Sequence, residues 1–111
     1  MEIELTKDAD KLFCLIYKGY LEDVKSGISK SDAKTTWSSK DIFSRHSDKL
    51  KLTFKDVDET CRELSRKGLL KCGYADDVVY HSEITDKGII YMEQRFKNGL
   101  TGLIDFITKF I

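Results

Sequence analysis

Three basic side chains between residues 54 and 66 stand at spacings suited to binding an anion or a nucleic-acid base. Lys55, Arg62 and Arg66 are seven and four residues apart, so a helix would project them from one outward face. An arginine can donate two hydrogen bonds to a phosphate or to the acceptor edge of guanine. Glu59, on an adjacent flank, can accept a hydrogen bond from cytosine. These four residues are our candidates for contact with a DNA groove.

The same segment also admits a purely structural interpretation. Asp58 and Arg62, and likewise Glu63 and Lys67, lie four residues apart. Such pairs stabilise a solvated helix by roughly 0.2–0.5 kcal/mol each. The acidic side chains gather on one flank, which could instead face a protein partner. This acidic flank consists of Asp56, Glu59 and Glu63.

Basic residues concentrate just before this helix. The stretch from Lys25 to Lys55 holds eight basic and three acidic residues, whereas residues 56–93 hold nine acidic and five basic ones. Cations placed beside a groove-binding helix bind phosphates, which sets affinity and register without reading sequence. Solvated basic loops have the same composition, so both interpretations stay open. The candidate phosphate-binding residues are Lys34, Lys40 and Arg45.

Composition indicates one soluble globular domain. The chain has 111 residues, 41% of them hydrophobic and 34% charged, and its formal net charge is zero. A neutral chain lacks the general electrostatic attraction to nucleic acid that strongly basic proteins have. Three cysteines without a CxxC spacing favour free thiols in a reducing compartment, and no stretch is typical of a secretory signal or a membrane span. We therefore expect a cytoplasmic protein.

Catalytic and metal-binding patterns are not found in the sequence. It has no phosphate-binding glycine loop, no G-x-S-x-G and no H-E-x-x-H. Cys61, Cys72, His46 and His81 offer four metal-ligand side chains, but none are paired at zinc-site spacing. We expect no enzymatic activity, no cofactor and no bound metal.

Periodicity predicts the elements that must position these side chains. Apolar residues at three- and four-residue steps predict a helix over about residues 9–24, capped by Thr6 or Asp8 and ended by Gly27. The serine-rich residues 26–40 indicate a loop with a short strand at residues 35–37. A short helix capped by Ser38 or Ser39 should reach about His46.

The second half of the chain carries equally clear signals. Thr53 should cap the candidate helix, and Gly68 should end it. The runs LLKCGY and VVYHSEI, separated by ADD, predict a β-hairpin, and Thr85 with Asp86 should start a helix extending to Phe96. The inward stripe comprises Phe54, Val57, Cys61 and Leu64.

The last residues, LTGLIDFITKFI, predict an amphipathic helix whose apolar stripe must pack against something. Three partners are open: the first helix of the same chain, the same helix in a second subunit, or a membrane surface. We favour a homodimer, since a symmetric pair would also present two groove-binding helices at a fixed spacing. The candidate dimerisation residues are Leu100, Leu103, Ile104, Ile107 and Phe110.

Two local motifs resemble the winged helix-turn-helix superfamily. "CRELSRKGLLK" is similar to the end of that family's third helix running into the first wing strand, and "EITDKGIIYME" to its transition from the second wing strand into a helix. The resemblance covers roughly residues 6–96. It implies an α+β, mainly α fold: helix, short strand, helix, helix, β-hairpin wing, helix. We therefore expect a winged-helix domain over residues 1–98 and an added C-terminal amphipathic helix over residues 99–111.

The resemblance also implies a function. Most members are transcription regulators that place the third helix in the DNA major groove with the wing beside it. Others are protein-interaction modules without DNA binding, which is our alternative. Two departures from the DNA-binding pattern favour that alternative: the acidic wing tip at Asp76 and Asp77, and the longer link between the second and third helices.

Overall fold

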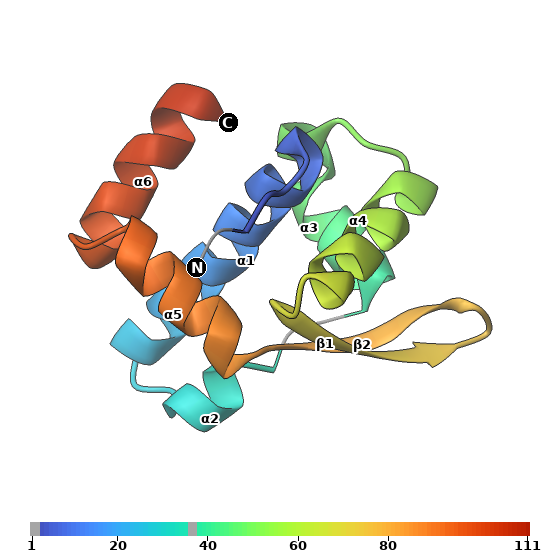
Figure 1. Ribbon diagram of the computed structural model, residues 1–111, viewed down its shortest axis with the longest axis horizontal. Coiled ribbons are helices and arrows are strands. Elements are labelled where there is room, and N and C mark those ends of the chain that lie inside the picture. Colours follow the sequence, from blue (N-terminus) through green and yellow to red (C-terminus); the bar gives the residue numbers. More distant parts are fainter. Residues whose placement is uncertain (1–2, 36–37) are drawn as a thin grey trace.

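Four helices precede a β-hairpin, and two further helices follow it (Figure 1). The structure, a computed structural model, describes residues 3–35 and 38–111. The fold is α+β and mainly α. Its elements are α1 (Lys7–Lys25), α2 (Lys30–Ala33), α3 (Ser39–Leu50), α4 (Phe54–Arg66), β1 (Leu70–Ala75), β2 (Val78–Ile84), α5 (Asp86–Arg95) and α6 (Gly99–Phe110).

The first five helices all begin in the same way, at a serine or threonine in extended backbone geometry. In each, the side-chain oxygen accepts a hydrogen bond from a backbone N–H three residues on, which satisfies a donor that the helix itself leaves unpaired. The predicted starts of α1, α3, α4 and α5 are thereby confirmed. The caps are Thr6, Ser29, Ser38, Thr53 and Thr85.

Two predictions for the middle of the chain were wrong in extent. Residues 30–33, predicted as loop, form the single-turn helix α2. Helix α3 continues past His46 to Leu50 and ends at Lys51, whose φ of 55° is left-handed. Leu50 is buried, and so is Ile42 two turns earlier. Packing of both residues into the core therefore extends α3 beyond the end that the local sequence pattern predicted.

The hairpin and its turn match the prediction. Strands β1 and β2 pair antiparallel from Leu70 opposite Ile84 to Ala75 opposite Val78, with an irregularity at Gly73 and Tyr74. Asp76 and Asp77 form the turn with φ of 52° and 63°, which short acidic side chains tolerate better than most. Of the strand predicted at residues 35–37, Thr35 forms one antiparallel bridge with Glu83, while Thr36 and Trp37 lie outside the described residues.

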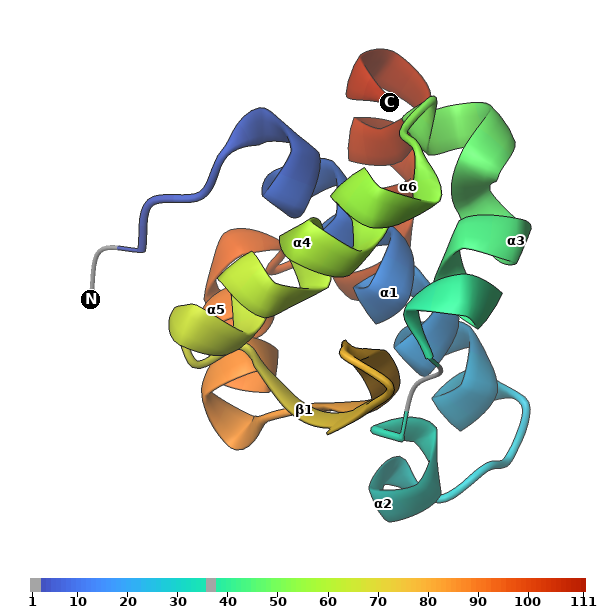
Figure 2. The same ribbon diagram turned by 90° about the vertical axis from the view of Figure 1, so that its right-hand side faces the viewer.

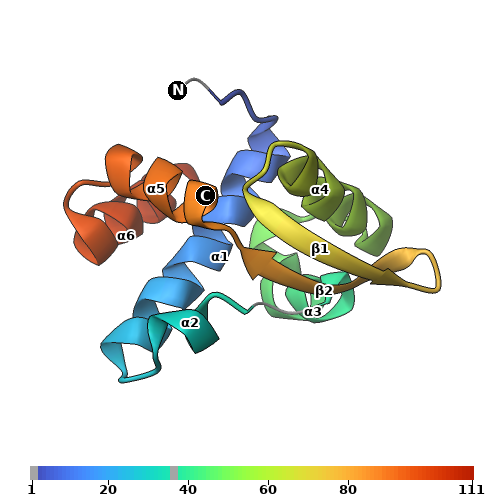
Figure 3. The ribbon, with the colours of Figure 1, turned by 60° about the horizontal axis from the view of Figure 1, so that its bottom comes forward.

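Helix α1 occupies the centre of the molecule. It contacts α2, α3, α4 and α6, and Phe13 of α1 lies 6.5 Å from the ring of Tyr91 in α5. Figure 3 shows α5 and α6 on one side of α1 and the hairpin with α3 and α4 on the other. This central position explains why nearly every apolar residue of its middle turns is buried, including Leu12, Phe13 and Ile16.

Helix α6 packs on α1 of its own chain, with Leu103 and Ile107 buried at the contact. The sequence left three packing partners open for the apolar stripe of this helix. The structure shows that α1 of the same chain covers part of the stripe. Within the described residues, none of the helices combines the length and apolar character needed to cross a membrane.

Candidate nucleic-acid interface

The outward face of α4 carries three of the four predicted groove residues in solvent-exposed positions. Lys55, Glu59 and Arg66 are all exposed. Figure 2 shows α4 with α3 on one side and the hairpin below it. Phe43 of α3 and Phe54 of α4 meet edge to face at 6.1 Å, which fixes the two helices side by side. The arrangement presents a continuous α3–α4–hairpin surface.

Arg62, the fourth groove candidate, is engaged inside the chain. Its Nε donates to Asp58 Oδ2 at 2.9 Å, and its Nη2 donates to the backbone carbonyl of Asp77 at 2.7 Å. Its guanidinium also lies over the ring of Tyr74, 4.8 Å from the centroid. Arg62 therefore holds the hairpin turn against α4, and its donors point at protein instead of solvent.

Asp58 is the buried centre of this junction. Its Oδ1 accepts hydrogen bonds from the hydroxyl of Ser39 and from the backbone N–H of Val79, both at 2.8 Å. Burial by itself would raise the pKa of Asp58, but the hydrogen bonds from Val79, Ser39 and Arg62 outweigh it and hold the pKa below its usual range. One carboxylate thus joins α3, α4 and β2.

Two of the three remaining acids of α4, Glu59 and Glu63, bond to different partners. Glu59 accepts a hydrogen bond from Arg66 at 3.2 Å, and both side chains are more than half exposed, so this pair adds little stability. Glu63 accepts from the backbone N–H and the hydroxyl of Thr6 at 2.9 and 2.8 Å. The predicted Asp58–Arg62 pair is confirmed. Glu63 bonds to the start of α1, and no ion pair with Lys67 occurs within residues 3–35 and 38–111.

The three phosphate candidates lie in different environments. Lys34 forms an ion pair with Asp86 at 2.7 Å, and this hydrogen bond raises the pKa of Lys34 and lowers that of Asp86. Lys34 therefore ties the segment after α2 to the start of α5. Lys40 and Arg45 are both exposed on α3, and they project from that helix about 140° apart.

A cleft of about 410 Å³ lies between the first half of α4 and the hairpin turn. Its charged lining consists of four carboxylates and two cations, and one of the cations is the already engaged Arg62. A phosphate entering this cleft would meet net negative charge, whereas a lysine or arginine would be attracted. The lining residues are Phe54, Lys55, Asp56, Asp58, Glu59, Arg62, Asp77 and Val78.

The thiols do not add a reactive group to this surface. Burial raises the pKa of Cys61 and of Cys14 to about 12 in each case, which favours the unreactive thiol form. Cys72 is half-buried and its Sγ approaches the carbonyl of Cys61 at 3.8 Å. Across the described part of the chain, no three side chains of the metal-binding types gather closely enough to hold an ion.

The candidate dimerisation residues of α6 are split by the fold. Leu103 and Ile107 are buried within the same chain, whereas Ile104 and Phe110 are 39% and 64% exposed. Leu100 is half-buried. A second subunit could therefore contact only the outer part of the stripe.

Comparison of the chain with protein-family models, with curated proteins and with solved structures found no match in any of the three.

Proposed function

We propose that this chain is a winged-helix domain that binds duplex DNA, with α4 as the groove-facing helix and the hairpin as its wing. Three features support the fold assignment. The element order agrees with that superfamily, α3 and α4 are packed directly together, and Thr35 bridges to Glu83 as a short first strand would. The added helix α6 lies on the opposite side of α1 (Figure 3).

The observation that carries DNA binding is the exposure of cations on the directly packed helices α3 and α4. Lys40 and Arg45 of α3 and Lys55 of α4 are exposed on adjacent, directly packed helices. Exposed cations can neutralise phosphates of a duplex that lies against these two helices. Because Asp76 and Asp77 occupy the hairpin turn, phosphate contacts come from α3 and from Lys55 of α4 in this proposal, and the wing contributes shape only.

The contact set is narrower than the sequence suggested. Arg62 and Lys34 serve intramolecular junctions, so we assign them no DNA contact. Arg66 remains a groove contact because its pair with Glu59 is exposed and can be exchanged for an acceptor on DNA. Glu59, once released, is available to a cytosine amino group.

Fluorescence anisotropy with a labelled mixed-sequence duplex tests this proposal. We expect binding at about 50 mM salt that weakens steeply by about 200 mM, as displacement of counterions requires. Lys40→Gln combined with Lys55→Gln should flatten the dependence of log affinity on log salt by about two units. Lys25→Gln combined with Lys30→Gln, on the far α1–α2 side, is the matched control. Failure to detect any duplex binding in low salt contradicts the proposal.

A second candidate function, a protein-interaction module, is favoured by the acidic cleft between α4 and the hairpin. Its four carboxylates suit a basic segment of a partner protein. Asp56→Asn combined with Asp77→Asn, which removes two cleft carboxylates to which we assign no DNA contact, separates the two functions. If DNA faces α4, removing these charges raises duplex affinity, whereas a basic partner would be bound less tightly. Anisotropy with the duplex and with a labelled arginine-rich peptide measures both outcomes.

A further inference from the structure

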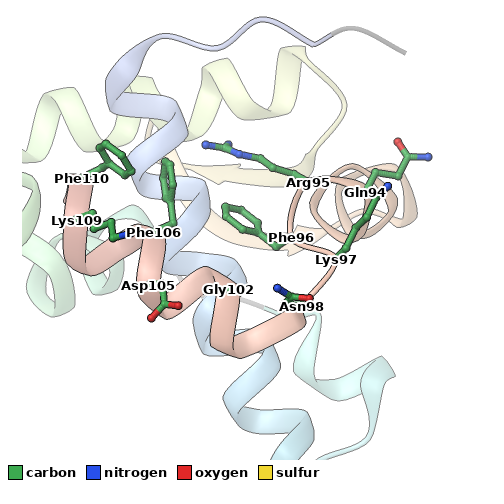
Figure 4. A pocket seen from close by; sticks show the side chains of 10 residues that line it. All are labelled: Gln94, Arg95, Phe96, Lys97, Asn98, Gly102, Asp105, Phe106, Lys109 and Phe110. Carbon is green, nitrogen blue, oxygen red and sulfur yellow. The ribbon is translucent and has the colours of Figure 1, made fainter.

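A second concave surface lies on the side of the molecule away from α4. A cleft of about 480 Å³ opens between the C-terminal end of α5 and α6, and we call it the aromatic cleft. Figure 4 shows its three phenylalanine rings and the Arg95 side chain between these two elements. The residues of this cleft that matter below are Arg95, Phe96, Lys97, Phe106, Lys109 and Phe110.

The rings of the aromatic cleft form a pre-arranged row. Phe96 and Phe106 meet edge to face at 5.5 Å, and Phe106 and Phe110 lie 4.9 Å apart. Arg95 lies over Phe96 and Phe106 at 4.9 and 4.8 Å, and Asp10 of α1 holds its guanidinium through both carboxylate oxygens. The three rings and Arg95 are therefore held in place before any partner binds, which lowers the entropic penalty of binding.

Phe110 stands between two hollows. The aromatic cleft lies on one side, and a smaller cleft of about 320 Å³ on the other side is lined by Phe106 and Phe110 together with Lys7 and Lys11 of α1. Phe110 is 64% exposed, although its ring continues the row formed by the buried Phe96 and the half-buried Phe106. Phe110 therefore offers apolar surface to both clefts.

The charged residues lining the two clefts number five cations and two carboxylates. Asp10 is neutralised by Arg95, so Asp105 stands against four lysines. No ion pair between described residues engages any of these lysines. The rim around Phe110 is thus positive, although the chain as a whole is neutral. The four lysines are Lys7, Lys11, Lys97 and Lys109.

This positive rim decides between the possible occupants. A second copy of the chain docking by two-fold symmetry would bring the lysine rim against itself, which like charges oppose. A single-stranded nucleic acid needs several open ring faces for base stacking. Here Arg95 already covers Phe96 and Phe106, so only Phe110 offers one.

We propose that the aromatic cleft binds an acidic segment of a partner protein, with an apolar anchor residue of that segment packed against Phe106 and Phe110. Carboxylates flanking the anchor pair with Lys97 and Lys109 on one side of Phe110 and with Lys7 and Lys11 on the other. The site is independent of the proposed DNA contacts, because it lies on α1, α5 and α6 and not on α3, α4 and the hairpin.

Amide chemical-shift mapping of the full chain tests this inference. The probe is a short peptide of glutamates interrupted by phenylalanine and leucine, and its control has every glutamate replaced by lysine. We expect the acidic peptide alone to shift amides of α6, the end of α5 and the first turn of α1. Phe110→Ala, and separately Lys97→Gln with Lys109→Gln, should each weaken its binding about tenfold or more. Ile90→Ala is the control: it shortens an exposed apolar side chain of α5 outside the two clefts and should leave binding unchanged.

Several results would overturn the inference. Equal affinity for the acidic and the basic peptide would show that the lysines do not select the partner. Chemical shifts confined to α4 would show that the peptide binds outside the aromatic cleft. Unchanged affinity in Phe110→Ala would remove the anchor. A mass that grows with concentration in light scattering, and no longer does so in Phe110→Ala, would reassign the cleft to a second copy. No shift at millimolar acidic peptide also contradicts the proposal.

Discussion

The hydroxyl of Ser39 donates a 2.8 Å hydrogen bond to the carboxylate of Asp58, nineteen residues later in the chain. Ser39 is fully buried and Asp58 is 8% exposed. The same carboxylate accepts from Val79 and Arg62. Asp58 therefore joins α3, α4 and the hairpin, the three elements of the proposed DNA-binding surface, and acts together with the Phe43–Phe54 contact and the bond from Arg62 to the hairpin turn.

Replacing Asp58 with alanine should destabilise the fold strongly. The change leaves the backbone N–H of Val79 without its acceptor in a buried site and removes the carboxylate that accepts from Arg62, while the Ser39 hydroxyl keeps the carbonyl of Val79 as an acceptor at 3.2 Å. We therefore expect a loss of about 2–4 kcal/mol in the free energy of unfolding. Urea denaturation followed by circular dichroism measures it. Asp105→Ala, at an exposed position of α6, is the control and should change stability by less than about 0.5 kcal/mol. A similar small change for Asp58→Ala would show that the junction contributes little.

Arg62 and Arg66 should behave as different kinds of residue although they lie one turn apart. Arg62→Gln removes the contacts to Asp58 and to the hairpin turn, so it should lower the urea midpoint of unfolding. Arg66→Gln loses only an exposed pair and should leave the midpoint unchanged while weakening duplex binding. Midpoints and duplex affinities measured on both variants check the assignment. A lower urea midpoint in Arg66→Gln together with an unchanged midpoint in Arg62→Gln would contradict the assignment.

Two glycines in helices should respond in opposite directions to alanine. A Cβ at Gly88 would lie 2.6 Å from the backbone oxygen of Leu69 and 3.0 Å from the ring of Phe13. Gly88→Ala should therefore destabilise the protein by about 1–3 kcal/mol through overpacking. Gly19 of α1 has nothing within 4 Å of that position, so Gly19→Ala should stabilise by roughly 0.5–1 kcal/mol. Thermal or urea unfolding of both variants tests the pair, and a stabilised Gly88→Ala would contradict the close packing of α5 on Leu69.

Acid should weaken the fold through His46. Burial, helped by neighbouring Arg45, lowers the pKa of His46 in the folded state below its usual 6.5. The unfolded state therefore takes up the proton first, so this stability is fully present above about pH 6.5 and is lost as pH falls through the folded pKa. Urea unfolding at about pH 8 and about pH 5 should show a smaller difference in His46→Gln than in the parent chain. His81→Gln, at an exposed hairpin position, is the control, and equal pH dependence in all three proteins would refute the role of His46.

Much of the fold could be predicted because its signals are local. A serine or threonine that caps a helix bonds to an N–H only three residues away, so the caps could be predicted from the sequence: Thr53 and Thr85 directly, and Thr6 and Ser38 each as one of two candidates. Left-handed residues that end helices or make turns are similarly local. Gly68 and the Asp76–Asp77 turn adopt the positive φ that their residue types indicated.

The candidate site was predicted less well because its charges are paired over long distances. Lys34 and Asp86 are fifty-two residues apart, and Arg62 bonds to the carbonyl of Asp77 fifteen residues later. On the helix wheel, Arg62 lies with Lys55 and Arg66. The folded hairpin covers Arg62 and leaves the other two exposed. Ser39 and Asp58 carried no local signal of their shared burial.

The sequence by itself determined the kind and order of the elements, since helix caps, apolar periodicity and turn residues act within a few positions of one another. It also determined which side chains are charged on the outward half of α4. Only the tertiary structure decided which of those charges remain available. The hairpin folds back on α4 to engage Arg62, and α6 packs on α1 to gather lysines from α1, from α6 and from the segment between α5 and α6 around Phe110. Such selection depends on distances between residues far apart in the chain, which no local pattern encodes.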